Sequence, residues 1–501
     1  MHTRRTLRIA LALSSAVLLI CAFPRFDQPW CAWIALVPLL LVVRRTTARG
    51  AFGWSFLIGA AFFLSSMWWL LHVSVAGWLI LGLYLALYLG AFGWVAHRAS
   101  SAPPQRQLWL LPAAWVALEY ARTHLLSGVG WNLLGYSQTS WTVLIQFADL
   151  TGVWGVSGLL ALVNVALVQL PRRDASRRSV SRVAVLTMLL VLGAAGYGRW
   201  RLRHLEAGPP VAIAVAQGNI PQAQKWDQAY TEQILTRYEG LTREALRRHP
   251  QLIVWPETSV PGYLGIEEPL TQRMLALARA GEVPMLVGSP GGRLHGTVWE
   301  LTNSATLIDG RGALRQQYDK LHLVPFGEML PFERALFWIR AWLPPIGEFS
   351  AGHRVTVFRL EPLPPFSTLI CFEDAFPDLA RRFVREGAAL LLVITNDAWF
   401  GPSAAAYQHA QASRFRAVEL RVPVARAANT GWSGCIDAAG RVLGSVRDAR
   451  GTELFIPGTL TCDLPTSPHA ASLYRAWGDW FALLCVAATL AWLIRPRLRR
   501  Q

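Results

Sequence analysis

The sequence predicts a membrane protein of the α/β class in two parts: a polytopic bundle of about eight transmembrane helices and a layered α/β sandwich domain. Three observations support this prediction. Hydrophobic residues make up 53% of the chain and charged residues only 16%, against about 45–50% and about 25% in soluble domains. Long apolar stretches recur over residues 1–200, and short strands alternate with helices from residue 210 onward.

Apolar segments with the length of membrane helices fill most of the first part. A helix needs about 20 apolar residues to cross a bilayer, with about 17 as the usual lower limit. The predicted spans are residues 7–23, 30–43, 51–71, 74–96, 107–126, 150–170, 183–199 and 475–494. Residues 30–43 are shorter than this limit, and residues 107–126 contain Pro112, so these two segments fit least well.

Arginines set the predicted orientation of these spans. The net charge is +17, and only Lys225 and Lys320 of the 48 basic residues are lysines. The arginines gather beside apolar segments, which favours membrane topology over nucleic-acid binding. With eight spans, the basic clusters at 4–8, 44–49, 97–106, 172–182 and 495–500 fall on one side, the cytoplasmic side by the positive-inside rule. Arginines at 199–203 fall on the opposite side, against this rule.

Two charged residues interrupt the fifth predicted span. Glu119 and Arg122 stand three positions apart and precede the polar, glycine-rich stretch 130–138. A charge within a membrane segment is a candidate functional residue. The same spacing also suits a simple ion pair on one helix face, and both interpretations stay open.

The second part alternates strands and helices. Strands are expected at 211–218, 252–255, 283–288, 304–308, 355–360, 368–371, 389–395, 424–428 and 434–437. Helices are expected at 230–248, 270–280, 378–386 and 408–420. This order is typical of a layered α/β sandwich. The predicted domains are residues 1–206 (about seven membrane helices), 207–466 (the sandwich) and 467–501 (a last membrane helix and a basic tail).

Cys371 is a candidate nucleophile. It follows an apolar, partly β-branched run, and Glu373 and Asp374 come almost directly after it. A cysteine that ends a buried strand and faces acids has the setting of a reactive thiol. A free cysteine taken alone is more often a small core residue.

Glu257 and Lys320 are candidate partners of this thiol. Glu257 ends a second apolar strand, where a carboxylate could take a proton from a thiol; it also fits a surface turn after Pro256. Lys320 could stabilise an oxyanion as a point charge, or be an exposed lysine. A chain that uses arginine almost throughout should keep lysine where a compact amine matters.

The remaining cysteines do not suggest a metal site. No CxxC or Cys/His spacing of a structural zinc site is present. Cys21, Cys31 and Cys485 fall in apolar segments and fit packing roles. Cys435 and Cys462 could form a disulfide in an oxidising compartment, which the sequence does not settle.

Three motifs together resemble those of the nitrilase superfamily of carbon–nitrogen hydrolases: Trp255-Pro-Glu257, the stretch 318–328 around Lys320, and Ile370-Cys371-x-Glu373. The membrane spans and four further stretches narrow this resemblance to the bacterial apolipoprotein N-acyltransferase family. Those stretches are Gln217-Gly-Asn219-Ile-Pro-Gln222-x-x-Lys225-Trp226, Gly135-Tyr-Ser-Gln138, Asn396-Asp397-Ala-Trp399-Phe400-Gly401 and Arg426-Ala-x-Asn429-Thr-Gly431.

The resemblance implies a nitrilase-like αββα sandwich with a Glu-Lys-Cys triad. By motif match Glu257 is the base, Lys320 the oxyanion stabiliser and Cys371 the nucleophile. The family moves the sn-1 acyl chain of a phospholipid, commonly phosphatidylethanolamine, to the cysteine as a thioester. The α-amino group of an S-diacylglyceryl-cysteine at the lipoprotein amino terminus then takes the acyl chain, which completes lipoprotein maturation.

The resemblance also implies supporting residues. Glu328, Glu373 and Trp226 match positions that are important in the family, and Asn396 and Trp399 are candidate substrate contacts. Phe372 departs from the usual tyrosine, so a role for a phenolic hydroxyl at this position is in doubt, whereas a ring that packs against substrate is retained.

An apolar stretch directly follows the lysine motif. Residues 330–345 suit a membrane-facing lid, with Trp338 and Trp342 at the interface; a core helix is the alternative. Both substrates are lipids, so the site must open to the bilayer, and an apolar lid would keep water from the thioester.

The resemblance implies a multi-pass protein of the bacterial inner membrane. Its catalytic domain would be periplasmic and both termini cytoplasmic. Expected partners are a phospholipid donor, diacylglyceryl apolipoproteins and membrane lipids, with no nucleic acid, no metal and no organic cofactor, and the chain is expected to be monomeric.

Two other functions compete with this interpretation. The triad alone also suits a membrane-tethered nitrilase-type amidase, although eight spans exceed what a tether needs. A transporter with a degenerate periplasmic domain is the third hypothesis. The spans hold no buried charge pair beyond Glu119/Arg122 and no obvious repeat, which speaks against it.

Overall fold

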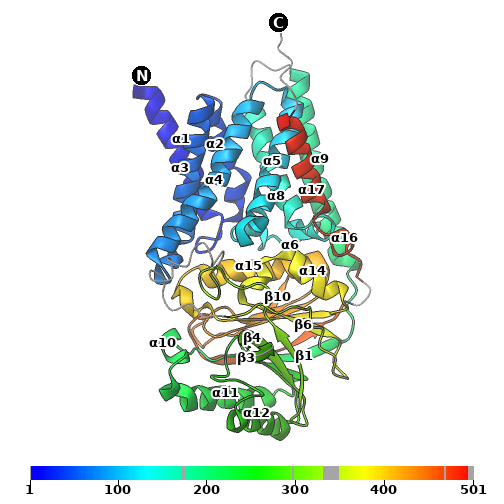
Figure 1. The fold of residues 1–501 in the computed structure, drawn as a ribbon. Coiled ribbons are helices and arrows are strands. Elements are labelled where there is room, and N and C mark those ends of the chain that lie inside the picture. Colours follow the sequence, from blue (N-terminus) through cyan, green and yellow to red (C-terminus); the bar gives the residue numbers. More distant parts are fainter. Residues whose placement is uncertain (1, 171–176, 296–297, 331–348, 468–469, 495–501) are drawn as a thin grey trace. The chain divides into compact units, whose positions relative to one another are not determined.

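A computed structural model describes residues 2–170, 177–295, 298–330, 349–467 and 470–494 (Figure 1). The chain folds into two compact units. The helical unit comprises Met1–His204, Ser403–Gln411 and Ser472–Gln501. The sandwich unit comprises Leu205–Pro402 and Ala412–Ala471.

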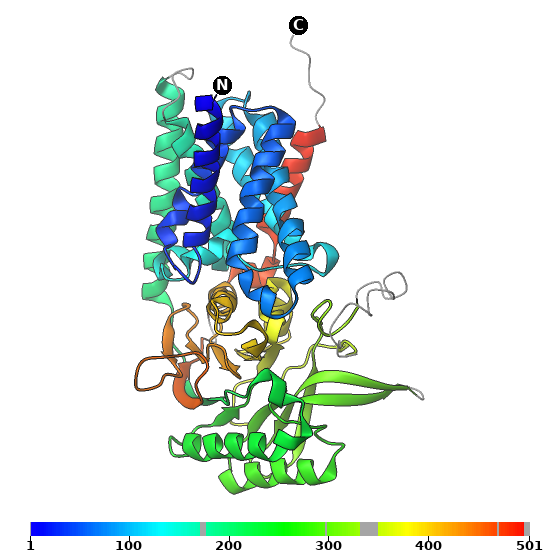
Figure 2. The same ribbon diagram turned by 90° about the vertical axis from the view of Figure 1, so that its left-hand side faces the viewer.

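The helical unit is built from helices that run side by side (Figure 2). Helix α3 packs against α4, and α5 packs against both α8 and α17. The helices are α1 (His2–Cys21), α2 (Leu36–Val43), α3 (Ala48–Ser66), α4 (Val75–Ala99), α5 (Pro104–His124), α6 (Thr142–Ile145), α7 (Ala148–Thr151), α8 (Val153–Gln169), α9 (Arg177–His204), α16 (Leu473–Trp477) and α17 (Trp480–Ile494).

Three helices in the described part of the chain are long and apolar enough to cross a membrane: Ala48–Ser66, Val75–Ala99 and Arg178–His204. A fourth crossing exists if Thr142–Thr151 and Val153–Gln169, bent by 118°, count as one broken span. The apolar segments Pro29–Val43 and Trp480–Ile494 are shorter. Eight spans are therefore not confirmed.

The sandwich unit contains two sheets. The first has the order β11-β1-β2-β3-β4-β5 and the second the order β10-β9-β8-β7-β6. Parallel pairing joins β1 to β2, β2 to β3, β6 to β7 and β7 to β8. The strands are β1 (Pro210–Gln217), β2 (Leu252–Val254), β3 (Met285–His295), β4 (Val298–Ile308), β5 (Leu314–Asp319), β6 (Phe366–Ile370), β7 (Leu390–Thr395), β8 (Val424–Ala428), β9 (Gly434–Ile436), β10 (Val442–Ser445) and β11 (Gly458–Pro465).

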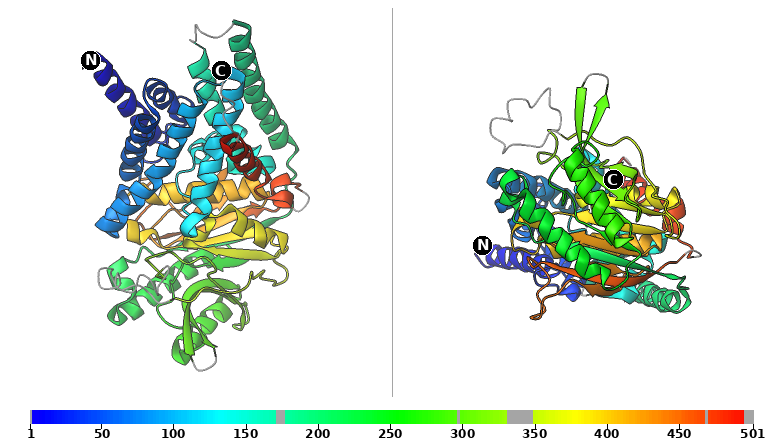
Figure 3. Two further views of the ribbon diagram at one scale, coloured as in Figure 1. Left: turned by 45° about the horizontal axis from the view of Figure 1, so that its top comes forward. Right: turned by 90° about the horizontal axis from the view of Figure 1, so that it is seen from below.

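Helices cover the outer faces of this pair of sheets, which gives four layers (Figures 1 and 3). Helices α11 (Thr231–Leu246) and α12 (Glu268–Gly281) lie on the first sheet. Tyr238 of α11 stacks on Trp255 in the core between them, with ring centroids 4.9 Å apart. Helix α14 (Pro377–Arg385) and residues 412–420 of helix α15 (Ala405–Leu420) accompany the second sheet. A disulfide between Cys435 and Cys462 joins β9 to β11, and therefore the two sheets.

The sequence predicted the central strands better than the edge strands. Eight of the nine predicted strands correspond to β1–β4 and β6–β9, but the strand expected at 355–360 is wrong, because only Phe358 bridges to Phe366 there. β5, β10 and β11 were not predicted. All three lie at sheet edges, where polar and solvent-exposed residues are favoured and the apolar run of a central strand is missing.

Candidate active site

Cys371 stands at a sharp elbow directly after β6. Every residue of β6 is buried, and Cys371 opens a 3-10 turn, Cys371–Ala375, with a φ of +54°. Left-handed backbone is uncommon for a residue with a Cβ and is concentrated at functional sites. Thr258 (φ 44°) and Phe326 (φ 60°), close in sequence to the other predicted site residues, share this conformation. The elbow ends the apolar strand at Cys371, which is itself buried.

Glu257 follows β2 and is buried. Its turn lies against Gly288 of β3, where a Cβ would collide with the Pro256 carbonyl oxygen. Glycine at this position therefore allows the Glu257 turn to pack onto the strand. The Glu257 carboxylate accepts a hydrogen bond from Asn303 Nδ2 at 2.7 Å.

Lys320 follows β5, and its side chain is 1% exposed. Its Nζ lies 2.8 Å from Glu328 Oε2 and 3.6 Å from Glu257 Oε1. Asn303 Nδ2 also donates to Glu328, at 2.8 Å. One ammonium and one amide therefore hold the two carboxylates at the same place.

Electrostatics explain why the thiol in this cluster needs a base. Burial raises the pKa of the Cys371 thiol well above its usual value; the Glu257 and Asp397 carboxylates add to this, while the Lys320 charge opposes it. Burial disfavours the ammonium form of Lys320, but the charges of Glu328 and Glu257 outweigh burial and raise its pKa. Cys371 therefore rests as a thiol, and it needs a base at the moment of attack.

Glu373 ties the cysteine elbow to the lysine segment. Its carboxylate is buried and accepts hydrogen bonds from Ile370 N (2.7 Å), Leu321 N (2.8 Å), His322 N (3.0 Å) and the Tyr318 hydroxyl (2.8 Å). Burial raises the pKa of Glu373 to about 7, although these hydrogen bonds and the Lys320 charge lower it. Glu373 therefore connects the residues next to Lys320 with the residue before Cys371.

The remaining predicted residues lie around this cluster. Asn396 is buried and donates to Gln222 Oε1 at 2.8 Å, so it holds a neighbouring segment of the unit. Phe372 packs edge-on against Phe376. Trp226 and Trp399 are about half exposed, at 52% and 48%. Residues 331–345 of the predicted lid, including Trp338 and Trp342, lie outside the described residues, and Leu330 is buried.

Sequence reasoning missed three contributors. Asn303 bridges both carboxylates, and the buried polar run Thr302-Asn303-Ser304 within β4 was the available signal. Asp397 acts on the thiol and pairs with the buried Arg426, which also binds Asp374 at 2.7 Å. Lys225 is buried beside Glu257, and its signal was its rarity as one of two lysines in the chain.

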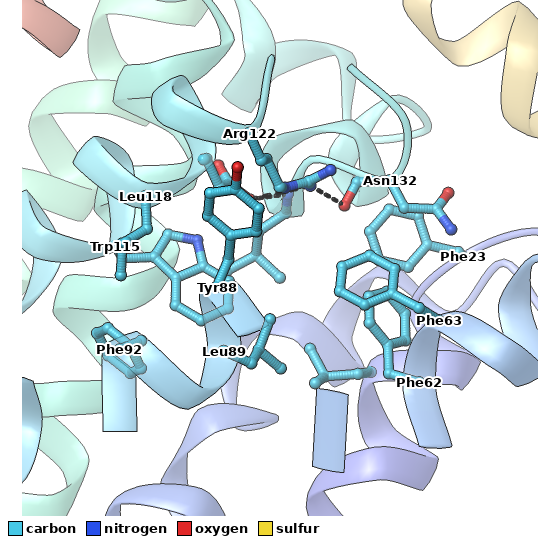
Figure 4. A pocket seen from close by; sticks show the side chains of 13 residues that line it. Phe23, Phe62, Phe63, Tyr88, Leu89, Phe92, Trp115, Leu118, Arg122 and Asn132 are labelled. Atoms are coloured by element: carbon cyan, nitrogen blue, oxygen red, sulfur yellow. Dashed lines mark hydrogen bonds and ion pairs between the residues drawn. The ribbon is translucent and has the colours of Figure 1, made fainter. Parts of the chain in front are cut away.

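The charged residues of the fifth predicted span form a separate cluster in the helical unit. Arg122 Nη2 lies 3.9 Å from Glu119 Oε1, which matches the expected pair at three positions' spacing. Arg122 also donates to the carbonyl oxygens of Val129, Trp131 and Asn132. Figure 4 shows Arg122 and Asn132 beside a pocket that is otherwise lined by Glu119 and by aromatic and aliphatic side chains.

The geometry of the sandwich unit suits nucleophilic acyl transfer. A thiol, a carboxylate within reach of a buried ammonium, and a second carboxylate that fixes this ammonium are together at strand ends. These groups can supply a nucleophile, a general base and positive charge for an oxyanion.

Two sequence families match the chain. Residues 15–166 match the apolipoprotein N-acyltransferase N-terminal domain, and residues 212–462 match carbon-nitrogen hydrolase.

Full-length relatives are similar to both parts. An apolipoprotein N-acyltransferase from Geobacter metallireducens is 39% identical over 495 residues, covering 95% of this chain and 93% of that protein. One from Methylococcus capsulatus is 35% identical over 492 residues, covering 95% and 94%. Among solved structures, an amidase from Nesterenkonia sp. AN1 covers 55% of this chain and 98% of its own, at 21% identity and a TM-score of 0.40.

Proposed function

This chain belongs to the apolipoprotein N-acyltransferase family, and on this premise we propose that Glu257, Lys320 and Cys371 perform its acyl transfer. The protein is an acyltransferase of lipoprotein maturation, and its sandwich unit has the carbon–nitrogen hydrolase fold. One observation carries the assignment of the residues. The Lys320 ammonium, 3.6 Å from Glu257 and 2.8 Å from Glu328, acts electrostatically on the Cys371 thiol.

The first half-reaction loads the enzyme. Glu257 takes the proton of the Cys371 thiol, and the sulfur attacks the sn-1 ester carbonyl of a phospholipid. Lys320 stabilises the negative charge on the carbonyl oxygen of the tetrahedral intermediate. The carbon–oxygen ester bond then breaks, Glu257 returns the proton to the departing glycerol oxygen, and a thioester remains on Cys371 as lysophospholipid leaves.

The second half-reaction transfers the acyl group from Cys371 to the amine acceptor. The neutral α-amino group of the diacylglyceryl-cysteine at an apolipoprotein amino terminus attacks the thioester carbonyl. Glu257 accepts a proton from the attacking nitrogen as the tetrahedral intermediate forms beside Lys320. The carbon–sulfur bond breaks, an amide is formed, and the sulfur regains a proton to restore the thiol. The product differs from that of an amidase because the acyl acceptor is an amine rather than water.

The finer assignments extend the family resemblance. We propose phosphatidylethanolamine as the donor, as this resemblance implies. We also propose a monomeric enzyme, because all proposed catalytic groups come from one chain. We also propose residues 1–206 as a membrane bundle of about seven spans, 207–466 as a periplasmic domain, and 467–501 as a last span with a cytoplasmic tail. The grouped arginines favour cytoplasmic termini in an inner membrane, and the Cys435–Cys462 disulfide suits an oxidising compartment.

Intact mass spectrometry tests this proposal directly. Detergent-purified protein is incubated with phosphatidylethanolamine of defined acyl chains, and the mass of the protein is followed over time. We expect a gain of one sn-1 acyl group that disappears when a synthetic diacylglyceryl-lipopeptide is added, with N-acylated lipopeptide as the product.

Three outcomes would contradict the proposal in different ways. No adduct and intact lipid would remove Cys371 from the reaction. An adduct that water discharges while the lipopeptide is ignored would indicate hydrolysis, as in an amidase. An adduct on a cysteine other than Cys371, located by peptide mapping, would overturn the assignment of the nucleophile.

A further inference from the structure

The two lysines of the chain meet at one carboxylate residue. Lys225 and Lys320 are the only lysines among 48 basic residues, and both are buried, at 4% and 1% exposure. Lys320 Nζ lies 3.6 Å from the Glu257 carboxylate, and Lys225 Nζ donates to the Glu257 main-chain oxygen at 2.7 Å. The mechanism above uses Lys320 and gives Lys225 no role.

Lys225 is held rigidly at this place. It ends the one-turn helix α10 (Gln222–Lys225). Asn396 Nδ2 donates to Gln222 at the start of this turn, and Asn429 binds both the N–H and the C=O of Ile220 just before it. Asn429 Nδ2 also donates to Asn396, at 3.0 Å. Two linked amides therefore fix the segment from which Lys225 reaches Glu257.

The contacts of the two ammonium groups differ. Lys320 has carboxylate partners, so its charge is compensated. Among the residues that the structure describes, the hydrogen bond of Lys225 goes to a neutral carbonyl. A buried charge without a directly bonded counter-ion is costly and is rarely kept without a function. Burial lowers the pKa of Lys225 to about 8, against the negative charges of Glu257 and, once its proton has left, Cys371.

We propose that Lys225 is a second functional lysine of the acyl transfer, a positioning residue that fixes the Glu257 turn and adds positive charge beside the Cys371 sulfur. This inference rests on the proposed function. As the thiol proton moves to Glu257, the negative charge moves from the carboxylate to the sulfur. Lys225 bonds the Glu257 main chain and interacts electrostatically with Glu257 and Cys371, whereas the charge of Lys320 is shared with Glu328.

The pH profile of Cys371 alkylation tests this role. Iodoacetamide reacts with the thiolate, and mass spectrometry of the Cys371 peptide gives its rate separately from that of the other free cysteines. In Lys225→Met we expect the rate at a given pH to fall about tenfold, the effect of roughly one unit of thiol pKa. Lys225→Arg keeps the charge and should recover most of the rate.

Arg237→Met is the matched control. Arg237 of α11 donates to the main-chain oxygens of Gly218 and Asn219, so the variant removes a cation near this segment, and these two hydrogen bonds do not involve Glu257. We expect its alkylation profile and acyl loading to equal those of the wild type. A Lys225→Met protein that folds, with wild-type alkylation and loading, would overturn the proposal.

A second measurement needs no substitution of Lys225. Labelling with ¹⁵Nζ-lysine gives two side-chain signals, because the chain has two lysines. We expect the signal of Lys225 to titrate near pH 8. Its midpoint should fall in Glu257→Gln, because this variant loses a negative charge that favours the ammonium form of Lys225. Two signals that both titrate above pH 10, unchanged in Glu257→Gln, would contradict the proposal. Loss of wild-type acyl loading would instead refute the proposed function, so the two failures are distinguishable.

Discussion

Arg122 in the helical unit and Lys320 in the sandwich unit are both buried cations, but their partners differ. Arg122 directs its guanidinium to the main-chain oxygens of Val129, Trp131 and Asn132, and its carboxylate neighbour is 3.9 Å away. Lys320 lies against the carboxylates of Glu328 and Glu257. The first cation closes a loop onto a helix, and the second concentrates charge beside a thiol.

This difference teaches how a buried charge can be interpreted. A cation that donates hydrogen bonds to main-chain carbonyls has a structural role, because those carbonyls would otherwise be buried without partners. Glu119 behaves in the same way when its carboxylate accepts from Leu134 N at 2.7 Å. A cation among acids and a nucleophile instead changes their protonation equilibria. We therefore expect substitutions in the two clusters to affect different measurements.

Cys371→Ala should give the largest effect. Loss of the nucleophile removes the covalent route, so we expect N-acylation of a lipopeptide to fall by about 10⁴-fold or more. Intact mass spectrometry should detect no acyl adduct. Cys485→Ala, at another buried free cysteine, is the matched control and should keep both activity and adduct. Detection of an acyl-enzyme in Cys371→Ala would contradict the expectation that the chemistry takes place at the cluster of Lys320 and Cys371.

Lys320→Met should reduce the rate less, by about 100- to 1,000-fold, which is typical of removing one oxyanion-stabilising group. Single-turnover acyl loading measures this effect. Lys320→Arg should not restore it, because a planar guanidinium does not replace a compact ammonium between two carboxylates. Wild-type loading in Lys320→Arg would mean that positive charge alone suffices.

Arg122→Gln should act on stability and leave the chemistry intact. Breaking a buried pair typically costs about 3–5 kcal/mol, because the other charge is left uncompensated. We expect a lower thermal unfolding midpoint in detergent, and acyl loading per folded molecule within about threefold of wild type. Arg49→Gln, at an exposed arginine of α3, is the control. A stable Arg122→Gln protein with lost acyl loading would give Arg122 a functional role.

Substitution of Glu373 should give the smallest effect, a change in how the stability of the protein depends on pH. Its pKa is raised from 4.5 to about 7 in the fold, so the folded state keeps this proton to higher pH than the unfolded state. Stability therefore declines as pH rises from about 4.5 to about 7, by at most about 3 kcal/mol. Thermal midpoints across this range should show the decline in wild type and in Glu206→Gln, an exposed control. Glu373→Gln should lack this component, and an undiminished decline would contradict the assignment.

The sequence alone predicted the reacting groups and the layered α/β sandwich. Apolar runs that end abruptly in Glu257 and Cys371 identified two strand ends. Such a run predicts a strand reliably here because the whole strand is buried. The scarcity of lysine marked Lys320 without any knowledge of its neighbours. The central strands and the helices that cover them followed from the same periodicity.

Only the tertiary structure decided which side chains meet. Asn303 reaches two carboxylates from a different strand, and Lys225 reaches the Glu257 main chain across 32 residues of sequence. Edge strands such as β5 carry polar residues because one side faces solvent, so they lack an apolar signal. The contacts of Arg122 with main-chain carbonyls came only from the structure, and a functional role of the pair Glu119–Arg122 stays a prediction. Distances between segments far apart in sequence depend on packing, which local patterns do not encode.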